Sequence, residues 1–397
     1  MISLTKKLTD TVKFRHGAEI KGRIVQPPML TNSGLSQGFV SQDTLDYYQA
    51  RSESASLVIV EYCYVIKDGG PSHTWAANKE QLGIQTDAHI EGLSQIAKAL
   101  KAKGNKAMVQ INHSGRESNF PARHGGRALA PSAIDFSFLD YPVEEITEEE
   151  IYQVIEAFGD ATRRAIQAGF DGVEIHGANH YLHQQFFSKW SNQRTDQWGG
   201  SYENRTRFIR AVNDKVFEVV RQEAPKDFIV GYRISPEEIH GDNVGYTYED
   251  STRLVADLGK AYDFDYIHVS HLDYKHKPEG QDLTYAQLYR QVLPEEVKLI
   301  VVGGITNEEK AADALNYADL AAVGRGTLID PQFGKKIMEG RGQDIVTKIS
   351  PEQVKISKLP PALVTLFSDP QMPLQLAGRE SIFSLHGQDS DYYREGY

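Results

Sequence analysis

The sequence predicts an α/β protein built on a closed (β/α)8 barrel, the TIM-barrel fold. Eight short runs rich in apolar and β-branched residues alternate with segments of helical periodicity along most of the 397 residues. The runs are nearly continuously apolar, which is typical of parallel strands covered by helices on both faces. Eight repeats of strand and helix favour closure into a barrel over an open sheet.

The predicted strands are bounded by Gly, Pro or polar residues, as strand ends usually are. They cover residues 22–29, 57–65, 106–112, 171–177, 228–235, 266–270, 299–305 and 319–326. Pro27 and Pro28 end the first strand because proline cannot donate to a sheet ladder.

Two helices illustrate the intervening segments. One is expected around residues 88–101. The other is expected between Thr147 and Gly169, where apolar residues recur on one helical stripe. Thr147 and Glu150 have the spacing of a capping box, and Gly169 suits the helix end. We therefore expect this helix to begin directly after Thr147.

The sequence divides into a barrel domain, residues 1–345, and an extension, residues 346–397. The barrel proper is expected over residues 22–345, because the strand and helix repeats fall within it. Residues 113–147 are too long for an ordinary connection and predict an excursion between the third strand and third helix, facing the substrate as a lid. The extension ends in Tyr- and Asp-rich clusters. We expect its tail, residues 385–397, to pack at a subunit interface of a homo-oligomer.

Composition excludes several classes of protein. A formal net charge of −11 argues against a nucleic-acid-binding face. No apolar stretch approaches the roughly 20 residues of a membrane span, and the N-terminal segment lacks the apolar core of a signal peptide. Cys63 is the only cysteine, so an internal disulfide and a cysteine-built iron–sulfur or zinc site are excluded. We expect a cytoplasmic protein without nucleic-acid or membrane partners.

Polar side chains gather at the ends of the predicted strands, where a barrel of this kind builds its site. Gln110 ends the third strand, His176 and Asn179 follow the fourth, and Arg233 lies near the end of the fifth. A buried guanidinium is costly unless it is paired. Arg233 is therefore expected to face either an internal carboxylate or an anionic cofactor edge.

Glycine steps follow the seventh and eighth strands, the positions at which many barrels bind phosphate. Gly303 and Gly304 lie in VVGGIT, and Gly324 and Arg325 lie in VGRGTLIDP. Glycine lets backbone N–H groups approach an anion, and arginine adds a charged contact. We favour a phosphate site over the alternative that these glycines only ease tight turns.

The run HGANHYLHQQFFSKWSNQRTDQWGGSYENRTRF, residues 176–208, resembles the signature of the old yellow enzyme family of FMN-dependent ene reductases. Those proteins carry His-x-Ala-Asn-Gly-Tyr-Leu and then Asn-x-Arg-Thr-Asp-x-x-Gly-Gly-Ser-x-Glu-Asn-Arg. RIVQPPM, VQINHSGR, VGYRISP, VVGGI and VGRG match the family's other landmarks in order. The resemblance covers about residues 15–340 and is greatest to the bacterial NAD(P)H-dependent flavin oxidoreductases.

The resemblance implies FMN as cofactor, NADH or NADPH as reductant, and an activated alkene as small-molecule substrate. By position, His176 and Asn179 would hydrogen-bond the carbonyl oxygen of an enone, and Tyr181 would protonate its α-carbon after hydride reaches the β-carbon. Arg233 would face the N1–C2 edge of the flavin. The remaining cofactor positions would line the ring or hold the phosphate: Pro27, Pro28, Met29, Leu30, Tyr62 and Gln110 for the ring, and Gly303, Gly304, Gly324 and Arg325 for the phosphate.

The sequence departs from the family pattern at three positions. His180 replaces the family's glycine between Asn179 and Tyr181 and adds bulk beside the expected acid. Tyr62 is larger than the usual Ala or Gly, so the surroundings of the flavin are expected to be tighter. Leu30 stands where relatives often carry Thr or Cys beside the flavin O4/N5 edge. Losing that hydrogen bond is expected to lower the reduction potential.

Other groups have simpler interpretations. The helical spacing of His176, His180 and His183 suits a metal, but no carboxylate accompanies them, and we expect none bound. We interpret Glu174 as a structural carboxylate. The polar residues of the signature run are expected to form a network tying their loop to the following helix: Arg194, Asp196, Glu203, Asn204 and Arg207.

Two rival functions stay open. One is a flavin-free barrel enzyme acting on a phosphorylated substrate, which would need a lysine or a carboxylate pair at the strand ends. Lys67 and Lys275 are the nearest candidates, and both lie beyond the rim. The other is a non-catalytic FMN-binding protein whose tail would be an interaction segment.

Overall fold

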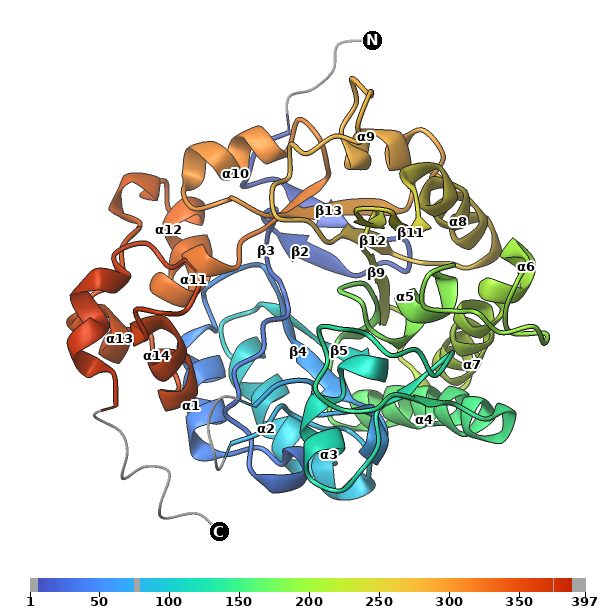
Figure 1. The fold of residues 1–397 in the computed structure, drawn as a ribbon. Helices are drawn as coiled ribbons and strands as arrows, with labels where there is room; N and C mark the ends of the chain where they lie inside the picture. The colour runs from blue at the N-terminus through green and yellow to red at the C-terminus, as the bar shows by residue number, and fades with distance from the viewer. Residues whose placement is uncertain (1–5, 75–78, 374, 388–397) are drawn as a thin grey trace.

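The computed structural model describes residues 6–74, 79–373 and 375–387. Its centre is a closed barrel of eight parallel strands, in the order β3-β4-β5-β8-β9-β12-β13-β14 (Figure 1). The strands are β3 Ile24–Gln26, β4 Leu57–Tyr64, β5 Lys106–Asn112, β8 Gly172–Gly177, β9 Ile229–Ile234, β12 Tyr266–Val269, β13 Lys298–Val302 and β14 Leu320–Ala322. The predicted fold class is confirmed, and each predicted strand is present with ends that differ by a few residues.

Helices surround the barrel on its outer face (Figure 1). In chain order they are α1 Gln42–Ala50, α2 Ile90–Lys101, α4 Glu148–Gln167, α7 Arg207–Glu223, α8 Tyr248–Ala261, α9 Tyr285–Arg290, α10 Glu308–Ala314, α11 Arg325–Ile329 and α12 Phe333–Met338. The longest, α4, begins at the predicted capping box: Thr147 Oγ1 accepts from the backbone N–H of Glu150, whose carboxylate accepts from the N–H of Thr147. Among the described residues, no helix has both the length and the apolarity of a bilayer-spanning segment.

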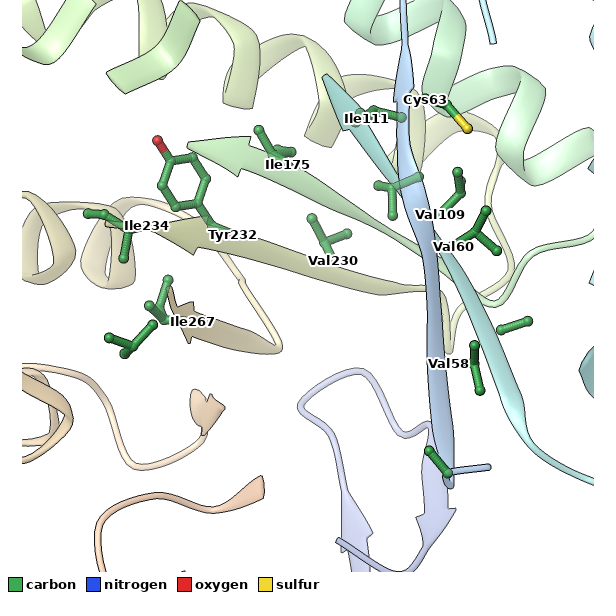
Figure 2. Packing of buried hydrophobic residues seen from close by; sticks show 14 of the residues in the cluster. Val58, Val60, Cys63, Val109, Ile111, Ile175, Val230, Tyr232, Ile234 and Ile267 are labelled. Atoms are coloured by element: carbon green, nitrogen blue, oxygen red, sulfur yellow. The ribbon is translucent and has the colours of Figure 1, made fainter. Parts of the chain in front are cut away.

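Alternation of side chains along the strands creates two apolar layers. The larger core lies between strands and helices and contains Val58, Val60, Val109, Ile175 and Val230 (Figure 2). The residues between them point into the barrel and form a second cluster, which includes Leu57, Ile59, Met108, Ile229 and Ile300. The barrel is therefore a packed core, and a ligand has room only at its mouth.

A hairpin closes the end of the barrel opposite the mouth. It consists of β1 Thr11–Lys13 and β2 Glu19–Lys21, which pair antiparallel just before β3. Phe14 in its turn joins the inner cluster, with its ring centroid 6.2 Å from that of Tyr266. This hairpin is not predictable from the sequence, because its strands are only three residues long.

The C-terminal extension packs on the barrel beside α1 and α11 (Figure 1). It contains α13 Pro351–Ile356 and α14 Pro361–Ser368. Arg51 Nη1 donates to the carbonyl of Ser357 at 2.8 Å, and Phe367 joins the larger core. The predicted subunit interface falls mainly on residues 388–397, which lie outside the described residues.

A buried carboxylate on β4 makes stability depend on pH. Glu61 is fully buried and accepts hydrogen bonds from Thr31 Oγ1 at 2.5 Å and from the backbone N–H of Leu82 at 3.3 Å. Burial outweighs these bonds and raises its pKa to about 7. The proton is thus held more tightly in the folded state than in the unfolded state. The associated stability is present below the unfolded pKa and is lost as pH rises through about 7.

Replacing Glu61 by Gln is expected to remove this dependence. Between pH 5 and pH 8 the wild-type protein should lose up to about 3 kcal/mol of unfolding free energy from this group, whereas the neutral amide loses none. Urea unfolding of both proteins at the two pH values measures the difference. Equal losses in the wild type and in Glu61→Gln would show that Glu61 is ionised throughout.

Candidate active site

His176, at the end of β8, presents a buried donor to the mouth of the barrel. Its side chain is fully buried, and Nδ1 accepts from the backbone N–H of Ala178 at 3.3 Å. The ring proton is therefore on Nε2, which has no hydrogen-bond partner within the described residues. Burial first, and the charge of Arg233 second, lower the pKa of His176 well below its usual value, so the ring stays neutral. A neutral N–H donor without a partner is suited to a substrate or cofactor oxygen.

Asn179 supplies a second donor beside His176. Its backbone is left-handed, with φ 58°, and its N–H donates to Ser235 Oγ at 2.9 Å. Its Oδ1 accepts from Ser270 Oγ at 2.9 Å. Because the oxygen is engaged by Ser270, the Nδ2 amide is left to donate toward the mouth.

Tyr181 completes this group of side chains. Its ring centroid lies 5.0 Å from that of His176, with the two rings perpendicular, and 5.4 Å from that of Tyr62. Burial raises the pKa of Tyr181, while hydrogen bonds with Ser72 and Tyr62 lower it in part. The phenol is therefore protonated at neutral pH and can act as a proton donor. Tyr62 packs against both other rings, since it also lies 5.5 Å from His176.

Arg233 and Gln110 form the floor of the mouth around a buried carboxylate. Glu174 accepts from Gln110 Nε2 at 2.6 Å and from the Tyr266 hydroxyl at 2.9 Å, and it contacts His268 Nδ1 at 2.9 Å. Burial alone would raise the pKa of Glu174, but His268, Arg233 and these hydrogen bonds lower it, so it is ionised. Glu174 supplies an internal negative charge that acts on Arg233, a side chain that is 7% exposed. The anionic cofactor edge expected for Arg233 stays a prediction.

The roles of Glu174 and His268 beneath the mouth were missed in the sequence analysis. Glu174 was interpreted only as a structural group, and His268 was given no role. The alternation of side chains along a strand could have indicated their position, because Glu174 and His176 are two residues apart on β8 and point to the same face. This places both side chains in the barrel interior.

The end of β3 borders the mouth on the other side. Pro27 and Pro28 are buried, whereas Met29 and Leu30 are half-buried. A Cβ on Gly324 would lie 3.3 Å from Met29 Sδ and 3.6 Å from Pro27 Cγ, so the segments following β3 and β14 are in contact. Glycine at position 324 thus allows the close packing of these two segments.

The glycine steps lie side by side because β13 and β14 are paired through Val302 and Ala322. Gly303 and Gly304 adopt positive φ angles of 113° and 71°. A side chain on Gly303 would meet the backbone of Leu272 and Asp273 at 2.5–2.6 Å, so only glycine fits there. Arg325 is exposed, and its Nη1 donates to the carbonyl of Gln375 at 3.1 Å. An anion bound here would therefore contact an arginine that also donates a hydrogen bond to the extension.

These residues fit FMN. Three buried polar atoms at the mouth have no partner within the described residues: His176 Nε2, Gln110 Oε1 and Arg233 Nε. Buried polar groups are nearly always satisfied, so such a cluster indicates a polar ligand. A flavin ring carries donors and acceptors along its pyrimidine edge, and the glycines beyond β13 and β14 leave room for its phosphate.

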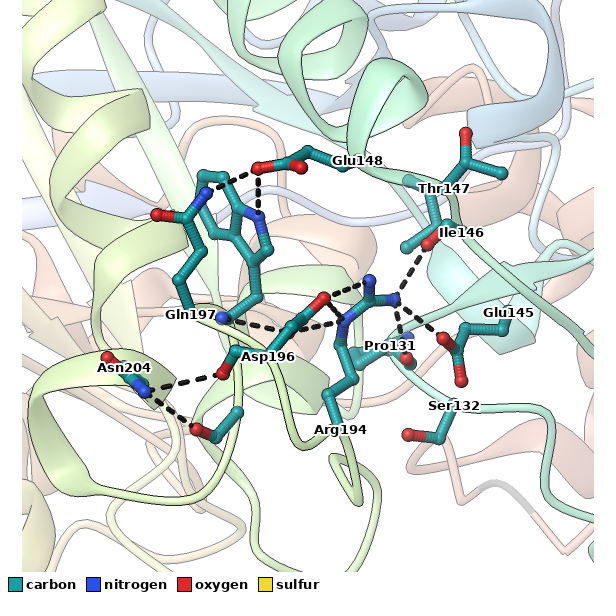
Figure 3. Close-up of polar contacts among 12 residues, drawn as sticks. Pro131, Ser132, Glu145, Ile146, Thr147, Glu148, Arg194, Asp196, Gln197 and Asn204 are labelled. Atoms are coloured by element: carbon teal, nitrogen blue, oxygen red, sulfur yellow. Dashed lines mark hydrogen bonds and ion pairs between the residues drawn. The ribbon is translucent and has the colours of Figure 1, made fainter.

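Four of the five polar residues predicted to form a network, Arg194, Asp196, Asn204 and Arg207, are joined by hydrogen bonds within or around the loop, whereas Glu203 pairs with Arg253 on α8 (Figure 3 shows Arg194, Asp196 and Asn204). Arg194 binds Asp196 at 2.6 Å and donates to the carbonyls of Ile146 at 2.7 Å and Pro131 at 3.1 Å. Asn204 donates to the carbonyls of Asp196 and Gly199 at 3.3 and 3.0 Å. This network joins the loop after β8 to the excursion and to the start of α4. Its residues are engaged with the backbone and not with the mouth.

The three histidines considered for a metal do not meet one another. His183 is buried among the rings of Phe158, Phe208 and Tyr232. Burial lowers the pKa of His183 to about 3, so it is a neutral core residue. His180 lies half-buried at a cavity of about 530 Å³ formed by the excursion and the segment after β9. The loop histidine His113 accepts from the N–H of Gly115 at 3.0 Å and shapes its own loop.

The barrel, the buried polar atoms without partners at its mouth and the glycine steps fit a flavin-binding barrel protein, and its family and relatives make it an FMN-dependent oxidoreductase reduced by NADH or NADPH. The sequence profile of the NADH:flavin oxidoreductase / NADH oxidase family matches residues 8–344. This protein belongs to that family.

Individual relatives agree with the assignment. The chain is 39% identical over 348 residues to the probable NADH-dependent flavin oxidoreductase YqiG of Bacillus subtilis, covering 87% of this chain and 91% of that protein. It is 41% identical over 343 residues to the NADH:acrylate oxidoreductase of Vibrio harveyi, covering 84% of this chain. The chain spans only 33% of the length of that Vibrio protein.

Solved structures show the same architecture. Morphinone reductase in complex with tetrahydroNAD superposes with a TM-score of 0.72 at 26% identity, covering 88% of this chain and 94% of that one. The old yellow enzyme homologue of Zymomonas mobilis has a TM-score of 0.74 at 24% identity, covering 90% and 99% of the two chains. The second likeness concerns the fold.

Proposed function

We propose that the protein reduces the carbon–carbon double bond of an activated alkene, with an α,β-unsaturated carbonyl as the type substrate. One observation carries the proposal: His176 Nε2 is a buried, neutral donor without a partner within the described residues. It lies with the amide of Asn179 and the phenol of Tyr181 at one side of the barrel mouth. Two donors and a proton source are the groups that conjugate reduction requires.

FMN, once reduced by NADH or NADPH, supplies the hydride. The protein's part begins with the substrate carbonyl, which accepts hydrogen bonds from His176 Nε2 and Asn179 Nδ2. As hydride reaches the β-carbon, negative charge grows on this oxygen, and donors fixed in advance stabilise that charge more than the ground state. Ser270 holds the amide of Asn179 in its orientation through Oδ1 at 2.9 Å.

Tyr181 then delivers a proton to the α-carbon from its hydroxyl. The hydroxyl is available because burial raises the pKa of Tyr181 above its usual value near 10. Beneath the mouth, Arg233 would hold the cofactor's pyrimidine edge and supply positive charge there, and the charge of Glu174 acts on that guanidinium. The rings of Tyr62 and Tyr181, whose centroids lie 5.4 Å apart, would cover one side of the bound alkene.

The names of two relatives support this substrate class. The Vibrio harveyi protein is named for acrylate, and a Klebsiella pneumoniae protein, 40% identical over 346 residues, is named for fumarate. Both compounds are alkenes conjugated to a carboxyl group. The chain spans 36% of the Klebsiella protein, so the likeness concerns one part of it.

Turnover of 2-cyclohexenone tests the proposal against both rivals. With NADH or NADPH under anaerobic conditions, the expected product is cyclohexanone, identified by gas chromatography. Cyclohexenol as the product would place hydride on the carbonyl carbon and contradict the roles of His176 and Asn179. FMN that stays oxidised with either nucleotide would favour a non-catalytic FMN-binding protein.

Leu30 offers a test of how the protein tunes its cofactor. Its half-buried side chain cannot hydrogen-bond, whereas Thr at this position can donate to the flavin edge. Replacing Leu30 by Thr is expected to raise the reduction potential by about 30 mV for each 1.4 kcal/mol that the bond favours the reduced form. Spectroelectrochemical titration measures the shift, and Leu30→Val serves as the apolar control. Equal reduction potentials in the wild type and in both variants would show that residue 30 does not contact the flavin edge.

We also propose a cytoplasmic setting and a homo-oligomer. The lone cysteine, Cys63, is fully buried and suits a reducing compartment. Light scattering of the purified protein would give a mass above the 44.5 kDa of one chain. A monomer would contradict the oligomer and leave the site as described.

A further inference from the structure

His180, Glu238 and His240 meet at the rim of the cavity beside the candidate active site. Each offers one ligand atom, an imidazole nitrogen or a carboxylate oxygen, and these atoms lie within 4.8 Å of one another. Glu238 and His240 belong to β10 Glu238–His240, which pairs with β11 Asn243–Tyr246 in a hairpin after β9. Residues far apart in the sequence thus converge on one point.

Glu238 carries a buried oxygen that accepts no hydrogen bond from the described residues. The residue is 2% exposed, and its Oε2 accepts from Gln184 Nε2 at 3.2 Å. Its Oε1 has no hydrogen-bond partner within the described residues and lies 3.9 Å from His180 Nδ1. An unsatisfied buried carboxylate oxygen is costly, and a cation is one ligand that would relieve the cost.

His180 is held in a conformation that histidine rarely adopts. Its φ of 64° is left-handed, a region that residues other than glycine adopt uncommonly. Its backbone N–H donates to Gln184 Oε1 at 2.9 Å, which fixes the residue beside Glu238. Its Nδ1 lies 3.3 Å from Gln184 Nε2 and 3.9 Å from Glu238 Oε1, so the ring is held against the carboxylate.

We propose that His180, Glu238 and His240 bind a divalent first-row transition-metal ion, with Zn²⁺ as the ion of best fit. Two imidazoles and one carboxylate are a common zinc donor set, and they leave a fourth position for water or a ligand oxygen. In a tetrahedral site with bonds near 2.0 Å the donor atoms lie about 3.3 Å apart. The three ligand atoms lie up to 4.8 Å apart, so side chains must rotate to bring them to this separation. His240 is exposed and can rotate.

Among the described residues, Arg116 is the arginine or lysine that lies close to Glu238. Its Nη2 lies 3.9 Å from Glu238 Oε1, too far for a hydrogen bond. The rest of the guanidinium is engaged elsewhere: Nε donates to Glu117 at 3.1 Å, Nη1 donates to Ser191, and the carbon lies 4.6 Å from the ring centroid of Phe136. Glu117 therefore balances the charge of Arg116, and Glu238 is left for the metal.

Isothermal titration of the tag-free, chelator-treated holoprotein with Zn²⁺ tests the proposal. One equivalent is expected to bind, and His240→Ala and Glu238→Gln should each weaken binding at least about tenfold. His180→Gly should do the same without loss of thermal stability, because glycine accepts the left-handed backbone. Exposed His240 makes no contribution to the core, so its variant stays folded.

The matched control is His276→Ala. His276 and His271 form another histidine pair, with their Nδ1 atoms 2.8 Å apart, and removing it should leave Zn²⁺ binding unchanged. Absence of binding to the wild-type protein would overturn the proposal. Binding that survives His240→Ala, or that is lost in His276→Ala, would overturn it as well. None of these readouts depends on the alkene-reductase activity.

Discussion

Replacing Tyr181 by Phe is expected to slow reoxidation of the reduced protein by 2-cyclohexenone about 10²–10⁴-fold, the usual contribution of a positioned acid. The substitution removes the hydroxyl and keeps the ring that packs 5.0 Å from His176. Reduction by NADH requires no proton from this group and should change little. Anaerobic stopped-flow absorbance measures the two half-reactions separately. Equal losses in both would contradict the role of Tyr181 as acid.

Tyr62→Phe is the matched control for this experiment. Tyr62 is the other phenol beside His176, with ring centroids 5.5 Å apart, and its ring contacts that of Tyr181. Because Tyr62 hydrogen-bonds Tyr181, its loss is expected to cost far less than the loss of the acid itself. A large loss in Tyr62→Phe with a small one in Tyr181→Phe would reassign the acid to Tyr62.

Removing either donor to the substrate oxygen is expected to lower kcat/KM for the enone by about 10²–10³-fold. His176→Ala deletes the buried Nε2 donor, and Asn179→Ala deletes the amide. Steady-state kinetics with NADH in excess measures each loss. The double variant should lose less than the product of the two single losses, because both donors act on one oxygen.

The Ser270→Ala variant tests whether Ser270 acts only by orienting the amide of Asn179. Ser270 touches Asn179 through Oδ1 at 2.9 Å and is expected to act only through it. Its variant should show a smaller loss than Asn179→Ala and no added loss when combined with it. Wild-type kcat/KM in both His176→Ala and Asn179→Ala would contradict the donor pair.

The fold was predictable from the sequence because most of its strands coincide with apolar runs of residues. The continuous apolar runs of β4, β5 and β9 are buried on both faces, and the capping box at Thr147 marks the start of α4. The N-terminal hairpin and β10 were not predictable in this way. Their strands have three residues each, and two of the three are exposed in every strand, so they contain no apolar run.

The site was predictable only in part. Strand-end positions located His176, Gln110 and Arg233, because parallel strands deliver such residues to one mouth. The convergence of Glu238 and His240 on His180 depends on how the segment after β9 folds back, which no local pattern in the sequence encodes. The hydrogen bond from Arg325 to the carbonyl of Gln375 likewise depends on where the extension packs, which the sequence does not show.

The central claim is that the barrel mouth holds an FMN whose reducing equivalents pass to an alkene gripped by His176 and Asn179. Anaerobic flavin absorbance of the purified protein tests it most directly, with NADH or NADPH added first and 2-cyclohexenone second. The expected result is one FMN per chain, bleached by the nucleotide and restored by the enone. A colourless protein that takes up no FMN, or a bleached flavin that the enone leaves reduced, would contradict the account.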